Sequence, residues 1–127
     1  PTQYADILGD KIEKHNADAY LVNTGWTGGS YGVGSRISLK NTRAIIDAIL
    51  DGSIEESEFE TTKYFKLQIP KSLPNVNAEI LNPRNAWQDK DAYQATAVKL
   101  AKEFKSNFNK FIATDSGKAV QEFGPEC

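Results

Sequence analysis

The feature that most constrains the fold is a glycine-rich stretch at residues 24–35, which reads TGWTGGSYGVGS. Its glycines are Gly25, Gly28, Gly29, Gly32 and Gly34. A short apolar run, AYLVN at residues 19–23, precedes it, and an amphipathic segment that begins at Ser38 follows it. This order predicts a buried strand, a loop and a helix, the local organisation of an α/β domain. In such domains ligands bind at the carboxyl ends of the strands, where this loop is expected to lie.

A loop of this kind suits an anion. Glycine lets the backbone approach a ligand closely, and the first N–H groups of a helix have no partner within the helix. The spacing fits no nucleotide template, however. Gly29 and Gly34 have the phosphate-loop spacing, but Ser35 and Arg36 occupy the lysine and hydroxyl positions, and Ile37 stands where a dinucleotide loop has its third glycine. Spacing alone therefore leaves open both a nucleotide-binding loop and a plain surface loop.

The rest of the chain predicts helices around a small β region. We expect a helix at residues 2–16, a helix capped by Ser38 and stopped by Gly52, and a long amphipathic helix from Asp89. Residues 59–62 and 65–69 are candidate strands of an antiparallel hairpin, and residues 70–85 form an irregular segment with a helical turn at 78–81. A short turn at residues 116–123 closes the chain. The expected fold is mixed α/β (α+β), with one domain over residues 1–127 and no second domain.

Composition excludes several classes of function. The net charge is −2 and the pI is near 5.4, which disfavours a nucleic-acid groove. No apolar run approaches the roughly 20 residues that span a bilayer, and no signal pattern opens the sequence, so we expect a cytoplasmic protein with no membrane partner. Cys127 is the only cysteine and His15 the only histidine, so neither an internal disulfide nor a zinc site is expected.

Longer motifs carry a resemblance to a known family. NTGWTGG, YGVGSRISLKNTRAIIDAILDGS, FETTKYFKLQIP and LNPRNAWQDKDAY follow one another in order, and the tail ends near GPEC. Together they closely resemble the C-terminal part of the ATP-dependent phosphoenolpyruvate carboxykinases, over essentially the whole chain. Members of that family are several times longer. The resemblance therefore implies that residues 1–127 are a C-terminal segment of the ATP-binding, mononucleotide-binding domain of such an enzyme.

The resemblance also implies a reaction. The parent enzyme decarboxylates oxaloacetate and transfers the γ-phosphoryl group of ATP to the enolate, giving phosphoenolpyruvate, ADP and CO2 in gluconeogenesis. Such a transfer requires Mg²⁺ or Mn²⁺ and cationic groups around the phosphates. In the family, the phosphate loop, the metal ligands and the substrate-binding arginine all precede the position of Pro1. No catalytic residue and no metal ligand is therefore expected in this chain.

Three positions are candidates for nucleotide contact. Arg36 could grip phosphate or ribose oxygens or lie on a base, and the alternative is a surface salt bridge of little weight. In the family, positions resembling Arg36, Ile37 and Thr42 contact ATP on its adenine and ribose side. Ser35 departs from relatives that often carry lysine there, so the contact is expected to be weaker by that charge.

Two functions follow from this reading. In the first, the chain is one wall of an ATP site, is inactive by itself, and needs the upstream part of the same enzyme as its partner. In the second, it is a free-standing non-catalytic nucleotide-binding or interaction domain. A self-sufficient domain should bury the stripe of Phe104, Phe108 and Phe111, whereas an excised segment should expose apolar patches.

Overall fold

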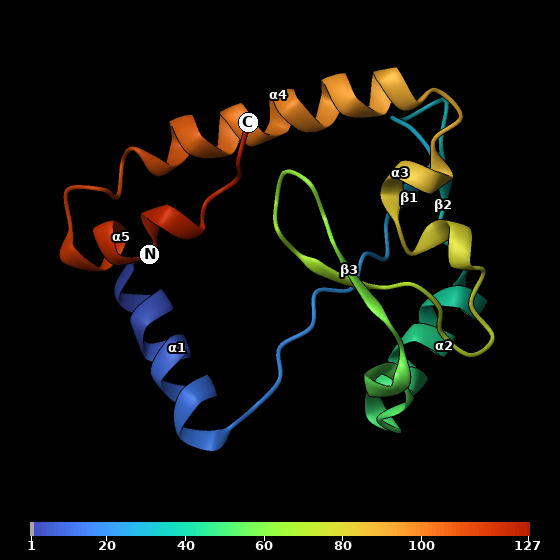
Figure 1. The fold of residues 1–127 in the computed structure, drawn as a ribbon, viewed down its shortest axis with the longest axis horizontal. Coiled ribbons are helices and arrows are strands. Elements are labelled where there is room, and N and C mark those ends of the chain that lie inside the picture. Colours follow the sequence, from blue (N-terminus) through green and yellow to red (C-terminus); the bar gives the residue numbers. More distant parts are fainter. Residues whose placement is uncertain (1) are drawn as a thin grey trace.

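The structure, a computed structural model that describes residues 2–127, consists of helices joined by two small antiparallel hairpins (Figure 1). The mixed α and β content expected from the sequence is confirmed. In chain order the elements are α1 (Thr2–His15), β1 (Trp26–Thr27), β2 (Ser35–Arg36), α2 (Leu39–Leu50), η1 (Ser53–Glu56), β3 (Phe59–Thr61), β4 (Gln68–Pro70), η2 (Ala78–Ile80), α3 (Pro83–Ala86), α4 (Lys90–Phe108), α5 (Asp115–Val120) and η3 (Gln121–Phe123).

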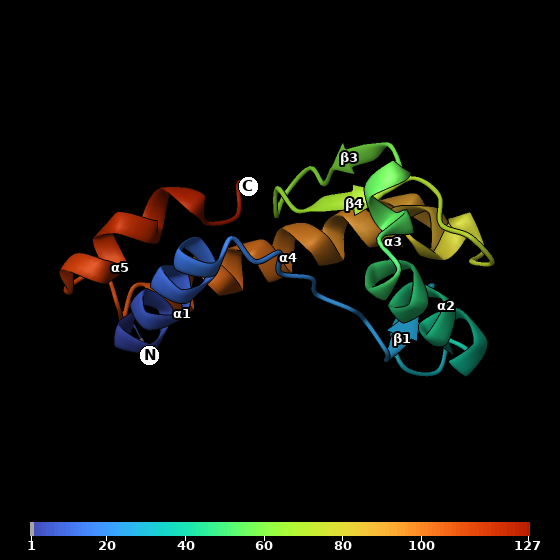
Figure 2. The same cartoon turned by 90° about the horizontal axis from the view of Figure 1, so that it is seen from below.

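The elements form an open frame rather than a closed globule. Helix α4 runs along one side, α1 and α5 meet at one end, and α2 with the β1–β2 hairpin lies at the other end (Figures 1 and 2). The accessible surface is 9539 Å² for a mass of 14.0 kDa. A folded monomer of this mass exposes about 6,700 Å². The chain thus exposes about 2,800 Å² more than a self-contained domain of its size.

A small apolar core lies under α2. It is formed by Ala48, Ile54 and Leu73, which are 2%, 4% and 7% exposed. The partly buried side chains around it are Ile45, Ile49, Val76 and Leu81. The irregular segment at residues 70–85 therefore covers α2 of this same chain. Its expected helical turn is confirmed as η2, while α3 was not expected.

The ends of α2 follow from local sequence. The Ser38 hydroxyl caps its first turn by accepting a hydrogen bond from the Asn41 N–H at 3.2 Å. After the last residue of the helix, Gly52 adopts φ 80°, a conformation that glycine takes without steric cost. The predicted start and stop of this helix are both confirmed.

The predicted hairpin is confirmed as β3 and β4. Its register pairs Phe59 with Pro70 and Thr61 with Gln68. The two strands are joined by residues 62–67, and Thr62 closes this connection by donating its N–H to the Leu67 carbonyl at 2.8 Å.

The long helix begins where expected. The Asp89 carboxylate caps α4 by accepting from two backbone N–H groups at 2.9 Å each. Its apolar stripe docks only in part: Ala97 and Ala101 are buried, whereas Phe104 is 55% exposed and meets Phe65 edge to face, with ring centroids 5.7 Å apart. Phe108 and Phe111 are half-buried, so the stripe is neither fully covered nor fully exposed.

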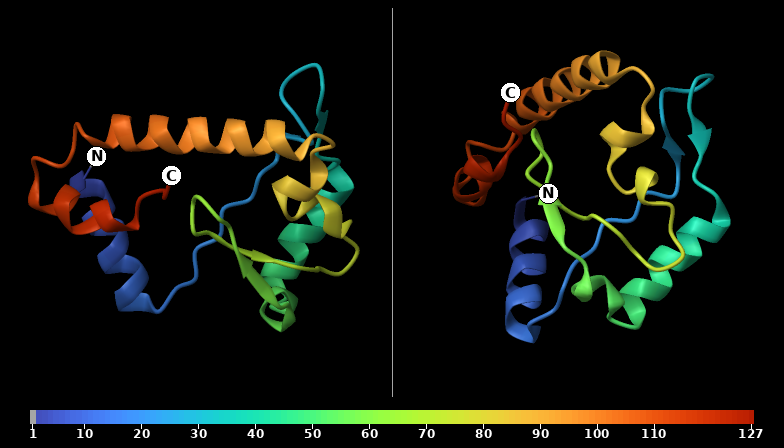
Figure 3. Two further views of the ribbon diagram at one scale, coloured as in Figure 1. Left: turned by 45° about the horizontal axis from the view of Figure 1, so that its top comes forward. Right: turned by 45° about the vertical axis from the view of Figure 1, so that its right-hand side comes forward.

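One predicted strand is wrong. Residues 19–23 are extended but pair with nothing (Figure 3). The Leu21 side chain is 89% exposed. A strand exists only where a neighbour accepts and donates its backbone hydrogen bonds. Residues 2–127 supply no such neighbour. The glycine-rich stretch itself contains a different strand, β1, which pairs with β2 at Ser35 and Arg36.

Candidate functional site

The β1–β2 hairpin and the start of α2 form one corner, and this corner holds the predicted site residues. The register pairs Trp26 with Arg36 and Thr27 with Ser35. Residues directly opposite in an antiparallel pair project from the same face. Trp26 is 44% exposed and meets Tyr31 edge-on, with ring centroids 5.3 Å apart. An aromatic surface and a guanidinium therefore share one exposed face.

The glycines are used to build the hairpin. A Cβ on Gly34 would lie 2.5 Å from the Thr27 carbonyl oxygen and 2.6 Å from that of Gly29, so the two sides of the loop cross too closely for any side chain. Both Val33 and Gly34 donate their N–H groups to the Ser30 carbonyl, at 3.0 and 2.9 Å. Those two amides are not available to a phosphate. Here the loop behaves as a tight turn, consistent with its failure to match the phosphate-loop template.

The three predicted residues occupy successive steps of the corner. Arg36 ends β2 and is exposed. Ile37 is buried, at 8% exposure, and its N–H donates to the Gly25 carbonyl at 2.8 Å. Thr42 is half-buried in the first turn of α2, where its N–H donates to the Ser38 carbonyl at 3.0 Å. The structure thus brings all three to one strand-to-helix corner.

The corner is a positive region of a weakly negative chain. Residues 19–46 contain Arg36, Lys40 and Arg43 and no aspartate or glutamate, although the whole chain has 17 acidic residues. All three cationic side chains are exposed, and none of the ion pairs between residues 2–127 includes Arg36. Among the described residues, Arg36 therefore forms no ion pair. The partial positive charge of the α2 N-terminus adds to this field. This segregation of charge was readable in the sequence.

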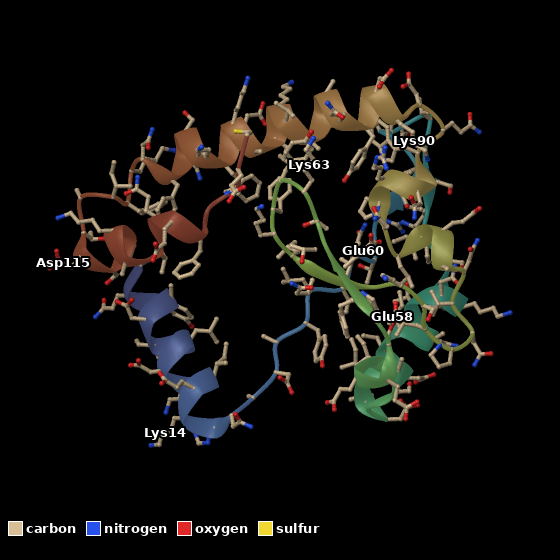
Figure 4. All side chains as sticks on the ribbon, viewed as in Figure 1. Lys14, Glu58, Glu60, Lys63, Lys90 and Asp115 are labelled. Atoms are coloured by element: carbon tan, nitrogen blue, oxygen red, sulfur yellow. The ribbon has the colours of Figure 1, made fainter. Side chains whose placement is uncertain are left out.

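A second wall stands behind the hairpin. A Cβ on Gly28 would lie 3.1 Å from the Ala86 carbonyl oxygen, so the loop packs directly on the end of α3. The corner between α3 and α4 is held by Lys90, whose ammonium donates to the carbonyls of Arg84, Asn85 and Trp87 at 2.8, 2.9 and 2.5 Å (Figure 4).

Sequence reasoning missed both α3 and the role of Lys90. The Asn82-Pro83 pair, an N-cap followed by proline at the first helical position, was a signal for α3.

Near the start of α4, burial raises the pKa of the Tyr93 hydroxyl. The Tyr93 ring meets the Trp87 ring edge to face, with ring centroids 5.8 Å apart.

The rest of the described chain offers no competing chemical centre. Residues 2–127 contain no group of three or more His, Cys, Asp or Glu side chains placed to hold a metal ion. A hollow of about 510 Å³ on α4 is lined by residues of that helix alone, so it is a helix surface rather than a cleft between elements. Among the helices of residues 2–127, none combines the length and the apolar character needed to cross a bilayer.

Known proteins resemble this chain over almost its whole length. The model of a family described as phosphoenolpyruvate carboxykinase matches residues 1–79. The phosphoenolpyruvate carboxykinase (ATP) of Sulfurimonas denitrificans is 61% identical over 126 residues, that of Campylobacter lari 54% over 125, and that of Leptospira biflexa 50% over 125. These alignments cover 98–99% of this chain but 24% of each relative. The chain therefore spans about a quarter of the length of the curated relatives it matches.

Proposed function

Because this chain belongs to the phosphoenolpyruvate carboxykinase (ATP) family, we propose that it supplies the adenine and ribose side of an ATP site in a longer enzyme. That enzyme converts oxaloacetate and ATP to phosphoenolpyruvate, ADP and CO2, a reaction of gluconeogenesis, and acts in the cytoplasm. We place the segment in the ATP-binding domain of that enzyme. The motifs predict that it lies in the C-terminal part of the enzyme.

The observation that carries this proposal is the register of the β1–β2 hairpin. It places Arg36 opposite Trp26, on an exposed face and directly before the capped start of α2. A guanidinium donates to phosphate or ribose oxygens in a fixed fork and also lies flat on a base. Arg36 forms no ion pair with another described residue, so its guanidinium remains available to an anionic ligand.

Ile37 and Thr42 have narrower roles. The Ile37 N–H is already bonded to Gly25, so contact with the nucleotide falls to its backbone carbonyl or to the edge of its largely buried side chain. The Thr42 N–H is likewise bonded within α2, which leaves its hydroxyl to reach a ribose or phosphate oxygen. For both residues, the backbone N–H is held by the fold, and only the carbonyl or the side chain is left to contact the nucleotide.

Catalysis requires groups that residues 2–127 do not provide. The Mg²⁺ or Mn²⁺ of phosphoryl transfer has no ligand cluster in this part of the chain, and the glycine loop lacks the phosphate-loop lysine. We therefore place the metal ligands, the oxaloacetate site and the phosphate-binding groups in the remaining part of the enzyme. The chain alone is expected to show no carboxykinase activity.

The alternative of a free-standing interaction domain has less support. Such a domain should bury most of its apolar surface, yet this chain exposes about 2,800 Å² more than a monomer of its mass. Its relatives are four times longer and share 50–61% identity with it over almost its whole length. A segment of a larger enzyme accounts for both facts.

The test uses a full-length chimera, in which this chain replaces the matched segment of the Sulfurimonas denitrificans relative. Titration calorimetry of Mg-ATP would compare the chimera with its Arg36→Ala variant. Loss of hydrogen bonds to a charged group costs about 1.5 to 3 kcal/mol, so we expect affinity to fall by about 10- to 150-fold. Arg36→Lys should fall between the two, because an ammonium keeps the charge but not the fork.

Lys102→Ala is the control, since it removes a cationic side chain from an exposed position on α4, outside the corner. It should leave ATP affinity within about twofold of the parent chimera, as an exposed substitution away from the site usually does. Equal affinities of the Arg36 and Lys102 variants would refute the proposed contact.

A further inference from the structure

Helix α3 is the support on which the glycine-rich loop rests. It lies beside the β1–β2 hairpin and the start of α4 (Figure 1). A Cβ on Gly28 would lie 3.1 Å from the Ala86 carbonyl oxygen, so the loop and the last residue of α3 are in close contact. Gly28 follows β1 directly, and β1 pairs with β2, which ends at Arg36. The position of α3 therefore influences where Arg36 lies.

A helix as short as α3 cannot satisfy its own carbonyl end. Among residues 2–127, no backbone N–H donates to the carbonyls of Arg84, Asn85 or Trp87. Carbonyls at a helix end are left to side chains or water. The Lys90 ammonium donates to all three, at 2.8, 2.9 and 2.5 Å, and so uses its three N–H donors on this one turn (Figure 4).

Lys90 stands at a position that local preference gives to other residues. It is the first residue of α4, and the positive end of a helix dipole disfavours a cation in the first turn. Departures from local preference are expected where function requires a particular residue. Here the lysine serves the preceding turn, because a lysine close to the end of a helix can bond to its last carbonyls.

The other end of α3 is held independently. Asn82 caps it by accepting a hydrogen bond from the Arg84 N–H at 3.0 Å, and the Asn82 amide donates to the half-buried Glu60 carboxylate on β3 at 2.9 Å. Helix α3 is thus tied to β3 at its start and to α4 at its end. Loss of the Lys90 bonds leaves the first tie in place, so α3 should shift rather than unfold.

We propose that Lys90 is a positioning residue of the nucleotide site: it fixes the end of α3 and, through Ala86 and Gly28, the hairpin that carries Arg36. The inference rests on the proposed function, because it concerns how the same guanidinium is presented to ATP. Small displacements matter, since a binding group must be held within about 0.5 Å of its productive geometry. Lys90 then affects ATP affinity although its own three donors are already in use.

A double-mutant cycle in the full-length chimera tests this role. Titration calorimetry of Mg-ATP compares Lys90→Met with Lys102→Met, which changes an exposed lysine of the same helix outside the α3–α4 turn. We expect Lys90→Met to weaken binding by about 5- to 20-fold and Lys102→Met by no more than about twofold. In the Arg36→Ala background, Lys90→Met should cost less than about twofold, because the contact that it positions is already lost.

Two results of the cycle would overturn the proposal. One is equal affinities of the Lys90 and Lys102 variants. The other is an equal loss from Lys90→Met with and without Arg36, because a general loss of stability lowers affinity in both backgrounds.

Amide hydrogen exchange gives a readout that does not depend on ATP. The Ile37 N–H donates to the Gly25 carbonyl at 2.8 Å and so closes the hairpin directly after Arg36. In Lys90→Met its exchange should be at least about fivefold faster than in Lys102→Met, with the amides at the centre of α2 unchanged. Unchanged Ile37 exchange, or an equal acceleration throughout α2, contradicts the positioning role.

The two measurements separate this inference from the proposed function. Undiminished ATP affinity of Arg36→Ala would refute the nucleotide contact, and Ile37 exchange would then decide whether Lys90 holds the hairpin. Arg36-dependent affinity together with equal affinities of Lys90→Met and Lys102→Met would refute the role of Lys90 and keep the contact.

Discussion

The core beneath α2 gives the sharpest test of how this chain is held together. Leu73 is 7% exposed and packs with Ala48 and Ile54 against the inner side of α2. Leu73→Ala removes three carbons, worth about 2.4 kcal/mol at about 0.8 kcal/mol for each buried CH2 group. The cavity left behind adds to this figure, because a small core relaxes only in part. We expect the opening free energy of the α2 region to fall by about 3 to 4 kcal/mol.

The assay is native-state hydrogen exchange of the α2 amides in the chain alone, supported by urea unfolding. Leu50→Ala is the matched control, since it makes the same substitution on α2 at a side chain that is 79% exposed. It should change the opening free energy by no more than about 0.5 kcal/mol. If both variants cost the same, the segment at residues 70–85 does not pack on α2, and the reasoning fails.

Three further predictions concern the hairpins and the α3–α4 corner. Gly34→Ala should destabilise the β1–β2 hairpin by about 1 to 3 kcal/mol, since its Cβ would meet the Thr27 carbonyl oxygen at 2.5 Å; unchanged amide exchange of the hairpin would count against this geometry. Lys90→Met keeps the aliphatic stem but removes hydrogen bonds to three carbonyls. We expect faster exchange at the start of α4 and a lower thermal midpoint, and an unchanged midpoint would show that water replaces the ammonium at no cost. A hydrogen bond from Lys71 holds the pKa of the exposed Glu58 carboxyl below its usual 4.5. The small stabilisation from this pair is therefore fully present above about pH 4.5 and lost as the pH falls through the lowered pKa. Carboxyl NMR titration should show that pKa, and Lys71→Met should return it to its usual value.

The helices could be predicted because their signals are local. Ser38 and Asp89 each cap a helix through a side-chain oxygen within three residues of the N–H groups that it binds. Gly52 ends α2 through its own backbone conformation. The β3–β4 hairpin was equally readable, since its strands are close in sequence. Two short helices, α3 and η1, were not predicted, and α3 is a single turn opened by an Asn-Pro pair.

The candidate site was readable in part. The motifs around Arg36, Ile37 and Thr42 identified the family, and the structure brings these residues to one corner. The sequence did not reveal that Trp26 lies opposite Arg36, because that register depends on a close crossing within the glycine loop. The wall behind the loop was also missed, since Lys90 acts through carbonyls of a turn whose shape only the fold defines.

The sequence by itself determined which family this chain belongs to, where α2 begins and ends, where α4 begins, and that residues 19–23 have the composition of a buried strand. Only the tertiary structure decided which residues face one another at the hairpin, and that the strand-like segment stands without a partner. The physical reason is the range of the interactions. A helix closes its hydrogen bonds within four residues of its own chain, whereas a strand must find them on a neighbour, and for residues 19–23 the described chain contains none.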